Sequence, residues 1–308
     1  MHMRREVVSA GAAAVGAALM TPFGGFAPTR ARAEGGALRV GVIADPQYAP
    51  VPPRGTRYYA NSLWKMDEAV ADLNARNLDF TVTLGDIIDR HWESYMHIMP
   101  IYDDLDAPGV FVLGNHDYAV AGDYLGSVER ILGLESAYYD FAGGGHRFLV
   151  IDGNEISLFA NPEGSENHEL ARERLSRLEA AGADNAKPWN GGISDAQFAW
   201  IEAKLREADA TGERVVVMGH YPLYPKDMHN MWDDERLVEL FTAHDNVALY
   251  MNGHNHAGNY GKAGGTHFMN FKGMVETAHT TAYSVLEVRD DRIEVHGRGV
   301  ERSRTLNL

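Results

Sequence analysis

Cysteine is absent from this chain of 308 residues. Its absence excludes a disulfide scaffold, a thiolate nucleophile and any Cys-ligated zinc or iron–sulfur site. Any bound metal must therefore be held by His, Asp, Glu, Asn or Gln side chains. Apolar residues make up 45% of the chain and charged residues 23%, which is the balance of a soluble globular protein with a sizeable core.

Positive charge is also scarce. The chain carries 28 Lys and Arg residues against 43 Asp and Glu residues, which gives a formal net charge of −15. Nucleic acid is not expected as a partner, because its phosphate backbone is bound by basic surfaces. A small anionic ligand would be repelled at long range, so its binding requires a strong local positive charge. Bound metal ions supply such a charge.

Long apolar runs are confined to the N-terminus, where the first 33 residues have the features of an export signal. Arg4 and Arg5 precede an apolar run from Val7 to Met20, and residues 31–33 (Ala-Arg-Ala) match an A-x-A cleavage site. The run is too short and too weakly apolar to form a stable membrane span. The paired arginines resemble a twin-arginine signal, which exports folded proteins. We therefore expect a signal peptide over residues 1–33 and a periplasmic or secreted location.

From residue 34 onwards, short apolar runs alternate with helical patterns, and no linker or repeat interrupts them. The order strand–helix–strand–helix–strand over residues 38–113 implies right-handed crossovers. Residues 194–197 (Ser-Asp-Ala-Gln) form a capping-box pattern that predicts a helix start. The expected strands are 38–44, 80–84, 110–113, 137–141, 147–151, 215–218, 247–251, 267–271, 283–288 and 292–296.

About ten strands are enough for two sheets packed face to face. The expected fold class is α/β: a two-sheet β-sandwich flanked by helices, with four layers in the order αββα. A single catalytic domain is expected over residues 34–308. The polar segment 157–192 is expected to form an insertion near the functional site.

Metal-capable side chains directly follow five of the apolar strands. The clusters are 45–47 (Asp-Pro-Gln), 85–90 (Gly-Asp-Ile-Ile-Asp-Arg), 114–117 (Gly-Asn-His-Asp), 219–220 (Gly-His) and 253–256 (Gly-His-Asn-His). In open α/β folds, sites form at the carboxyl ends of strands. Taken singly, each cluster is typical of an ordinary turn or bend. Turns do not explain the choice of His, however, so the combination of all five indicates a metal site.

The set D-x-Q, GDxxDR, GNHD, GH and GHxH resembles the five-block signature of the calcineurin-like metallophosphoesterases. The blocks extend from Asp45 to His256, which is nearly the whole chain after the export signal. Most of that superfamily carries D-x-H in the first block, whereas this chain has Gln47. This departure and the segments 43–48, 55–59, 275–278 and 297–299 are similar to one branch, the manganese-dependent ADP-ribose/CDP-alcohol diphosphatases.

The resemblance implies two divalent metal ions and the residues that hold them. The first ion would be held by Asp45, Gln47 and His256, the second by Asn115, His220 and His254, with Asp86 bridging both. A bridging carboxylate is chemically sensible, because two adjacent cations need an anion between them. The amide of Gln47 is a weaker ligand than an imidazole, so it should lower the affinity for the first ion and shift the preference from zinc or iron toward manganese or magnesium. Manganese is the expected metal, with magnesium, iron or zinc as the alternatives.

The resemblance also implies catalytic and substrate-binding residues. His116 directly follows a metal ligand, and it would stabilise the transition state or protonate the leaving group while a metal-activated water attacks phosphorus. Asp117 is expected to orient the His116 imidazole. The residues expected to contact the substrate are Arg57, Tyr58, Arg90 and Tyr221, with the segment 189–192 shaping the pocket.

The expected function is therefore hydrolysis of a phosphoanhydride such as ADP-ribose or a CDP-alcohol. The expected partner is a small, nucleotide-like phosphorylated substrate, and no protein partner is expected. A broader phosphomonoesterase or cyclic-nucleotide phosphodiesterase is the enzymatic alternative, because the superfamily shares its metal core. A non-catalytic metal-binding protein is the other alternative. It predicts an eroded ligand set, whereas only Gln47 departs from the pattern here.

Overall fold

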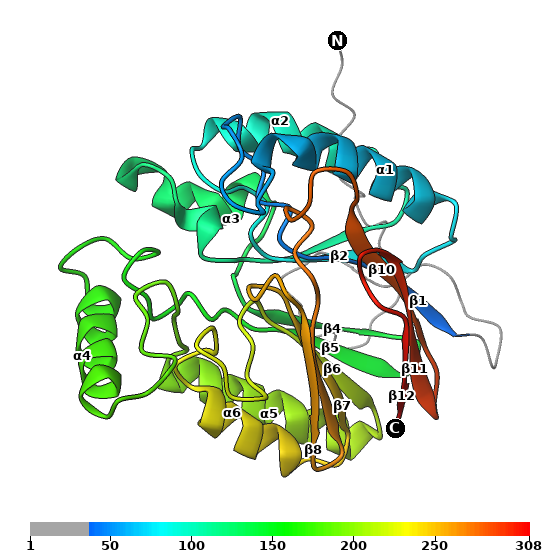
Figure 1. The fold of residues 1–308 in the computed structure, drawn as a ribbon. Helices are drawn as coiled ribbons and strands as arrows, with labels where there is room; N and C mark the ends of the chain where they lie inside the picture. Colours follow the sequence, from blue (N-terminus) through cyan, green and yellow to red (C-terminus); the bar gives the residue numbers. More distant parts are fainter. Residues whose placement is uncertain (1–36) are drawn as a thin grey trace, which may run out of the picture.

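The computed structural model describes residues 37–308, so the expected signal peptide over residues 1–33 lies outside the described part. Two six-stranded sheets pack face to face between outer helices (Figure 1). The first sheet has the order β12-β11-β10-β1-β2-β3. Its strands are β1 (Leu38–Ile43), β2 (Phe80–Leu84), β3 (Gly109–Val112), β10 (Ala282–Val288), β11 (Arg292–Gly299) and β12 (Arg304–Asn307).

The second sheet has the order β4-β5-β6-β7-β9-β8. Its strands are β4 (Tyr139–Gly143), β5 (His146–Val150), β6 (Arg214–Met218), β7 (Val247–Asn252), β8 (Asn259–Ala263) and β9 (Thr266–Asn270). Strands β1, β2 and β3 are parallel to one another, as are β5, β6, β7 and β9. The carboxyl ends of the parallel strands in each sheet therefore meet at one edge.

Helices cover the outer face of each sheet (Figure 1). Helices α1 (Ser62–Asn74) and α2 (Glu93–Tyr102) lie over the first sheet, and α5 (Asp195–Thr211) and α6 (Asp234–Thr242) lie over the second. The remaining helices are α3 (Val128–Ile131), α4 (Glu166–Ala180) and the 3₁₀ turns Tyr59–Asn61, His116–Tyr118 and Gly122–Ser127. In the described part of the chain, none of the helices combines the length and the apolar character that crossing a membrane requires.

The alternation of side chains along the strands explains the layers. In β5 and β6, Phe148 and Val216 belong to the core between the two sheets. Their neighbours Leu149 and Val217 belong to a second core beneath α5 and α6. Both faces of these strands are buried, which is why residues 148–151 and 215–218 are continuous apolar runs. Burying each such side chain contributes roughly 1.5–3 kcal/mol.

The expected sandwich is confirmed, and each of the ten expected strands is present. Their ends lie within two residues of those expected, except that β11 continues three residues further, to Gly299. Two short strands, β8 and β12, and helix α6 were not expected. The helix predicted from residues 194–197 begins at Asp195, and the Ser194 hydroxyl accepts a hydrogen bond from the Gln197 N–H. The reciprocal half of the capping box is wrong, because the Gln197 side chain bonds Asp152 and Glu155 instead.

Candidate metal centre

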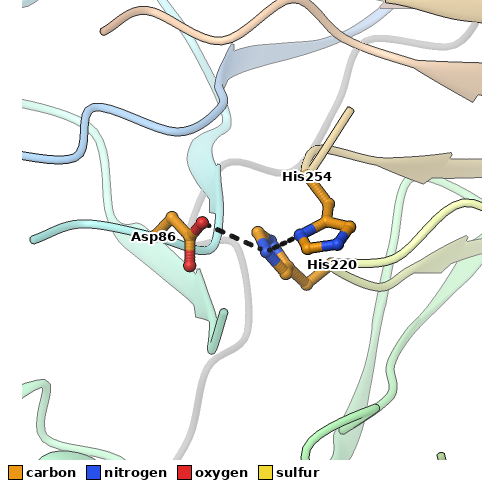
Figure 2. A group of neighbouring side chains, drawn as sticks. All are labelled: Asp86, His220 and His254. Carbon is orange, nitrogen blue, oxygen red and sulfur yellow. Dashed lines mark hydrogen bonds and ion pairs between the residues drawn. The ribbon is translucent and has the colours of Figure 1, made fainter. Parts of the chain in front are cut away.

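Two clusters of potential metal ligands meet where the parallel strands of both sheets end. One comprises Asp86, His220 and His254, and the other comprises Asp45, Asp86 and His256. Within each cluster, one ligand atom from each residue lies within 4.8 Å of the others. The Asp86 carboxylate belongs to both clusters, as a bridging ligand would. Figure 2 shows Asp86, His220 and His254 pointing toward one another from separate elements.

Hydrogen bonds outside the cluster fix the tautomers of two histidines. The His220 Nδ1 lies 2.8 Å from the Leu84 carbonyl oxygen, to which only a protonated Nδ1–H can donate. The His254 Nε2 lies 3.0 Å from the Asn190 Oδ1, and the Asn190 amide NH₂ donates to the carbonyls of Asn185 and Met228. The Asn190 Oδ1 is therefore the acceptor for His254. This arrangement leaves His220 Nε2 and His254 Nδ1 as lone pairs facing the cluster.

These lone pairs face one another and two further acceptor oxygens. The His220 Nε2 lies 3.2 Å from His254 Nδ1, 3.2 Å from the Asn115 Oδ1 and 3.4 Å from an Asp86 oxygen. Acceptor atoms this close together repel one another unless a positive charge lies between them. Burial lowers the pKa of the His220 imidazole, but the Asp86 carboxylate outweighs this effect and raises the pKa to about 9. The donor set thus fits a divalent cation.

The second cluster shows the same arrangement. The His256 Nδ1 lies 2.8 Å from a Glu276 oxygen, which leaves Nε2 to face Asp45 at 3.7 Å. The Gln47 Nε2 donates to Asp86 at 2.8 Å, and the buried Gln47 Oε1 has no hydrogen-bond partner among the described residues. An unpaired buried oxygen is costly, and a cation would satisfy it. The arrangement therefore fits a second cation beside the first.

The Asp86 carboxylate is held between the two clusters. One of its oxygens accepts the His116 backbone N–H at 2.8 Å, and the other accepts the Gln47 amide. Burial alone would raise the pKa of Asp86, but the imidazoles of His220 and His116 outweigh it and hold the pKa well below its usual range. The carboxylate is therefore anionic, as a bridging ligand requires.

Backbone strain is concentrated at the same residues. Positive φ values occur at seven non-glycine residues of the described chain, and four of them are expected ligands. These are Asp45 at 48°, Gln47 at 43°, Asp86 at 54° and His254 at 69°. Such conformations cost about 1–3 kcal/mol each and are retained where the surrounding structure imposes them, commonly at functional sites. The strain supports a functional role for these strand ends.

The hydrogen-bond partner of the His116 imidazole differs from the expected one. Its Nδ1 lies 2.9 Å from the Asp89 carbonyl oxygen and 3.3 Å from the Asp89 carboxylate. The expectation that Asp117 orients this imidazole is wrong. Asp117 is fully buried, and its carboxylate accepts hydrogen bonds from the backbone N–H groups of Asp86, Ile87 and Gly114 and from the Tyr95 hydroxyl. Asp117 thus stabilises the loops that carry the ligands.

The expected substrate contacts differ in their accessibility. Arg90 is part-exposed and pairs with Asp89, and Arg57 is part-exposed and lies 3.8 Å from Glu276. Both can therefore reach a ligand at the edge of the clusters. Tyr58 is half-buried, and its backbone N–H donates to the Val275 carbonyl. The expectation for Tyr221 is wrong, because it is fully buried and its ring packs 4.6 Å from that of His254.

Several residues near the clusters were not identified from the sequence as individual contributors. Asn190 fixes His254, and Glu276 fixes His256. The ring of His229 lies 5.6 Å from that of His254. The ammonium of the buried Lys65 donates to the carbonyls of residues 274–277, which positions the loop that carries Glu276. Of these residues, only Asn190 and Glu276 lie in segments that the sequence analysis had singled out, 189–192 and 275–278.

Comparison with known proteins gives consistent results. A family model described as calcineurin-like phosphoesterase matches residues 38–258. The manganese-dependent ADP-ribose/CDP-alcohol diphosphatase of Xenopus laevis is 27% identical over 318 residues, which cover 87% of this chain and 89% of the relative. The Arabidopsis thaliana protein of the same name is 26% identical over 289 residues, which cover 83% of this chain and 93% of the relative.

The fold also resembles a solved structure. The crystal structure of a dimetal phosphatase from Danio rerio superposes with a TM-score of 0.79 at 24% identity, covering 88% of this chain and 99% of that one. This likeness supports the architecture of the two sheets and their helices. Because the family model covers more than half of the sequence, the chain belongs to the calcineurin-like phosphoesterase family of metal-dependent hydrolases.

Proposed function

We propose that this protein is a manganese-dependent diphosphatase that hydrolyses the phosphoanhydride bond of ADP-ribose, CDP-alcohols or related nucleotide-like diphosphates. The observation that carries the proposal is the pair of ligand clusters sharing the Asp86 carboxylate. The names of the relatives from Xenopus laevis and Arabidopsis thaliana support the choice of substrate and metal. The ligand set itself supports manganese, because it combines carboxylate and amide oxygens with imidazoles and contains no thiolate.

The residues that would hold the metals are those named above. The first cation would be held by Asp45, Gln47 and His256, the second by Asn115, His220 and His254, and Asp86 would bridge them. When bound, the two cations would lower the pKa of a water molecule and neutralise charge on the phosphoryl oxygens. The protein contributes rigid positions for the ligands, because the outer nitrogen of each histidine is already hydrogen-bonded.

His116 is the candidate for proton transfer to the leaving group. In its protonated form, Nδ1–H donates to the Asp89 carbonyl, while Nε2–H has no partner among the described residues and is available to the leaving oxygen. Its side chain is 27% exposed, so a substrate can reach it. Arg90 can pair with a phosphate oxygen of the substrate, since its guanidinium is 42% exposed beside Asp89.

Substrate turnover tests the proposal. Initial rates should be measured for ADP-ribose, CDP-choline, cyclic AMP and p-nitrophenyl phosphate with Mn²⁺, Mg²⁺ or Zn²⁺. We expect the first two substrates to be cleaved at the phosphoanhydride bond, fastest with Mn²⁺. Cleavage of p-nitrophenyl phosphate alone would refute the diphosphatase assignment and indicate a phosphomonoesterase. No turnover of any substrate would indicate a non-catalytic metal-binding protein.

A substitution tests the role of His116. His116→Asn should lower kcat by about 10²- to 10⁴-fold, because that is the usual contribution of a general acid. Bound Mn²⁺ should change little, since the side chain of His116 belongs to neither cluster. The control is His91→Asn, which removes an exposed imidazole at a backbone conformation that Asn tolerates. An unaltered rate in His116→Asn would exclude the assigned role.

We also propose that residues 1–33 direct export by the twin-arginine route and that residues 34–308 form the catalytic unit. The sequence supports this proposal through Arg4-Arg5, the short apolar run and the A-x-A site. Export can be measured by fractionating cells that express the full chain. Replacing both arginines by lysine should retain the protein in the cytoplasm. Unchanged export of that variant would rule out the twin-arginine route.

A further inference from the structure

One cavity of the described structure differs in chemistry from the metal centre. Its volume is about 330 Å³, and it is lined by residues of the turn Gly122–Ser127, of the helix α3 and of the loop that leads from β5 to α4. The helices α3 and α4 are labelled in Figure 1. The residues that define its chemistry are Tyr118, Glu129, Asp152, Glu155, Asn161 and Asn167. The proposed metal chemistry uses none of them.

Backbone pairing in the second sheet connects the cavity lining to the metal centre. Strand β5 pairs in parallel with β6, and the Ile151 N–H donates to the Met218 carbonyl at 2.9 Å. Asp152 therefore follows β5 at the same sheet edge where His220 follows β6. On the other side, Tyr118 lies two residues after His116 in the same 3₁₀ turn. Residues of the cavity lining and of the metal centre thus follow neighbouring strands and share one 3₁₀ turn.

The lining of the cavity is rich in hydrogen-bond acceptors. None of its lining residues is Lys, Arg or His, whereas three are carboxylic acids. The amide NH₂ groups of Asn161 and Asn167 both donate to the Glu155 carbonyl, so their Oδ1 atoms remain as acceptors. A phosphate group is excluded by this charge. A ligand with several O–H or N–H donors would be complementary to it.

Asp152 is a largely buried acid in this lining. It is only 6% exposed, and its Oδ1 accepts the N–H and the amide of Asn154. No described residue donates a hydrogen bond to its Oδ2. Burial raises the pKa of Asp152 to about 7, as expected for a carboxyl with too few donors around it. The Oδ2 atom is therefore available to accept a hydrogen bond from a ligand hydroxyl in the cavity.

We propose that this cavity binds the ribosyl group of a nucleotide-like substrate, with the Asp152 carboxylate accepting hydrogen bonds from the vicinal hydroxyls. This inference rests on the proposed function and identifies the part of the substrate that determines specificity. Carboxylates are the usual acceptors for ribose hydroxyls in other nucleotide-binding folds. The cavity is also at the lower end of the size range of small-ligand sites, which suits a sugar better than a whole dinucleotide.

Equilibrium binding tests the inference without requiring turnover. Calorimetry with Mn²⁺-loaded protein should compare the non-cleavable α,β-methylene analogue of ADP with its 2′,3′-dideoxy form. We expect the wild-type protein to bind the ribosyl form about 10- to 100-fold more tightly, which is the usual contribution of hydrogen bonds to a charged acceptor. Asp152→Asn should reduce this preference, and Asp123→Asn, which replaces an exposed acid outside the lining, should preserve it.

A second variant guards against misfolding of Asp152→Asn. Glu129→Gln removes a carboxylate from the lining without breaking any hydrogen bond of its side chain in the described structure, and it should also reduce the ribosyl preference. Equal affinity of the wild-type protein for the two analogues would overturn the inference. Displacement of the ribosyl analogue by ethanolamine or choline, but not by free ribose, would also overturn the inference. The occupant of the cavity would then be an ammonium group. Retained preference for the ribosyl form without cleavage of either ADP-ribose or CDP-choline would refute the diphosphatase function and leave this inference intact.

Discussion

At the scale of single residues, each histidine ligand is fixed by an acceptor on its outer nitrogen. His220 uses the Leu84 carbonyl, His254 uses Asn190 and His256 uses Glu276. The sequence could predict the histidines because each follows an apolar strand directly. It could not predict the acceptors in the same way. One is a backbone atom, and Asn190 lies in a polar segment that has no strand before it.

Replacement of Glu276 tests whether these acceptors matter for metal binding. Glu276→Gln keeps the size of the side chain but removes the charge that His256 Nδ1 contacts. We expect the affinity for one of two Mn²⁺ ions to fall by about 10- to 100-fold, because outer partners of metal-binding histidines have effects of this size. Isothermal titration calorimetry with Mn²⁺ gives the affinity of each ion.

The matched control for Glu276→Gln is Glu163→Gln. Glu163 is exposed in a loop and has no hydrogen bond or ion pair of its side chain in the described structure. Both variants lose one negative charge, so a general electrostatic effect would weaken Mn²⁺ binding in both. A loss confined to Glu276→Gln would support a local effect through His256. Equal affinities in both variants would show that Glu276 does not position the ligand.

At the scale of secondary-structure elements, strands buried on both faces were identified from the sequence, whereas the two strands that were missed, β8 and β12, lie at edges of the sheets. Strands β2 (Phe-Thr-Val-Thr-Leu) and β6 (Arg-Val-Val-Val-Met) consist mainly of apolar and β-branched residues with nearly every residue buried, so their sequences identify them. The missed strand β8 (Asn-Tyr-Gly-Lys-Ala) has no fully buried residue, and β12 has only Leu306. Edge strands are short and polar because their outer side is unpaired. Their positions depend on the tertiary fold.

The turns after the strands must leave room for the ligands, and Gly253 provides a test. A Cβ atom at this position would lie 2.6 Å from an Asp45 carboxylate oxygen, which is closer than such atoms approach. Gly253→Ala should therefore displace Asp45 and weaken Mn²⁺ binding by at least tenfold. The control is Gly265→Ala, where a Cβ atom would meet no neighbour within 4 Å. Mn²⁺ titration of both variants measures the effect, and unchanged affinity in Gly253→Ala would show that the turn can adjust.

At the scale of the whole molecule, the metal centre joins the two sheets. Asp45 and Asp86 follow strands of the first sheet, whereas His220, His254 and His256 follow strands of the second. Both sheets therefore contribute ligands to one site, and bound cations would neutralise its carboxylates. Metal binding to this folded arrangement should stabilise the whole protein, by about 2.7 kcal/mol when free Mn²⁺ is 100 times its dissociation constant. A buried carboxylate that has no metal or ligand beside it lowers the stability of the folded protein.

The pH dependence of stability in the metal-free protein should show this effect at Asp152. Because burial raises the pKa of Asp152 to about 7, the folded protein keeps its proton up to that pH, whereas the unfolded chain loses it near the ordinary value of 3.8. The unfolded state thus binds fewer protons between these values, and the contribution of Asp152 to stability falls as the pH rises from about 4 to about 7. Asp152→Asn imitates the protonated carboxyl and does not titrate.

Urea unfolding at pH 4.5 and pH 8 with a chelator measures the difference between the two proteins. Other titrating groups, including His220 and His254, are common to both and cancel in this difference. The stability of Asp152→Asn relative to the wild-type protein should increase from pH 4.5 to pH 8 by on the order of 3 kcal/mol, at about 1.4 kcal/mol per pKa unit. The exposed Asp123→Asn should show no such change. A difference that does not depend on pH would mean that solvent or a neighbouring donor already satisfies the Asp152 carboxylate, which would also weaken its assignment as the acceptor for ribose.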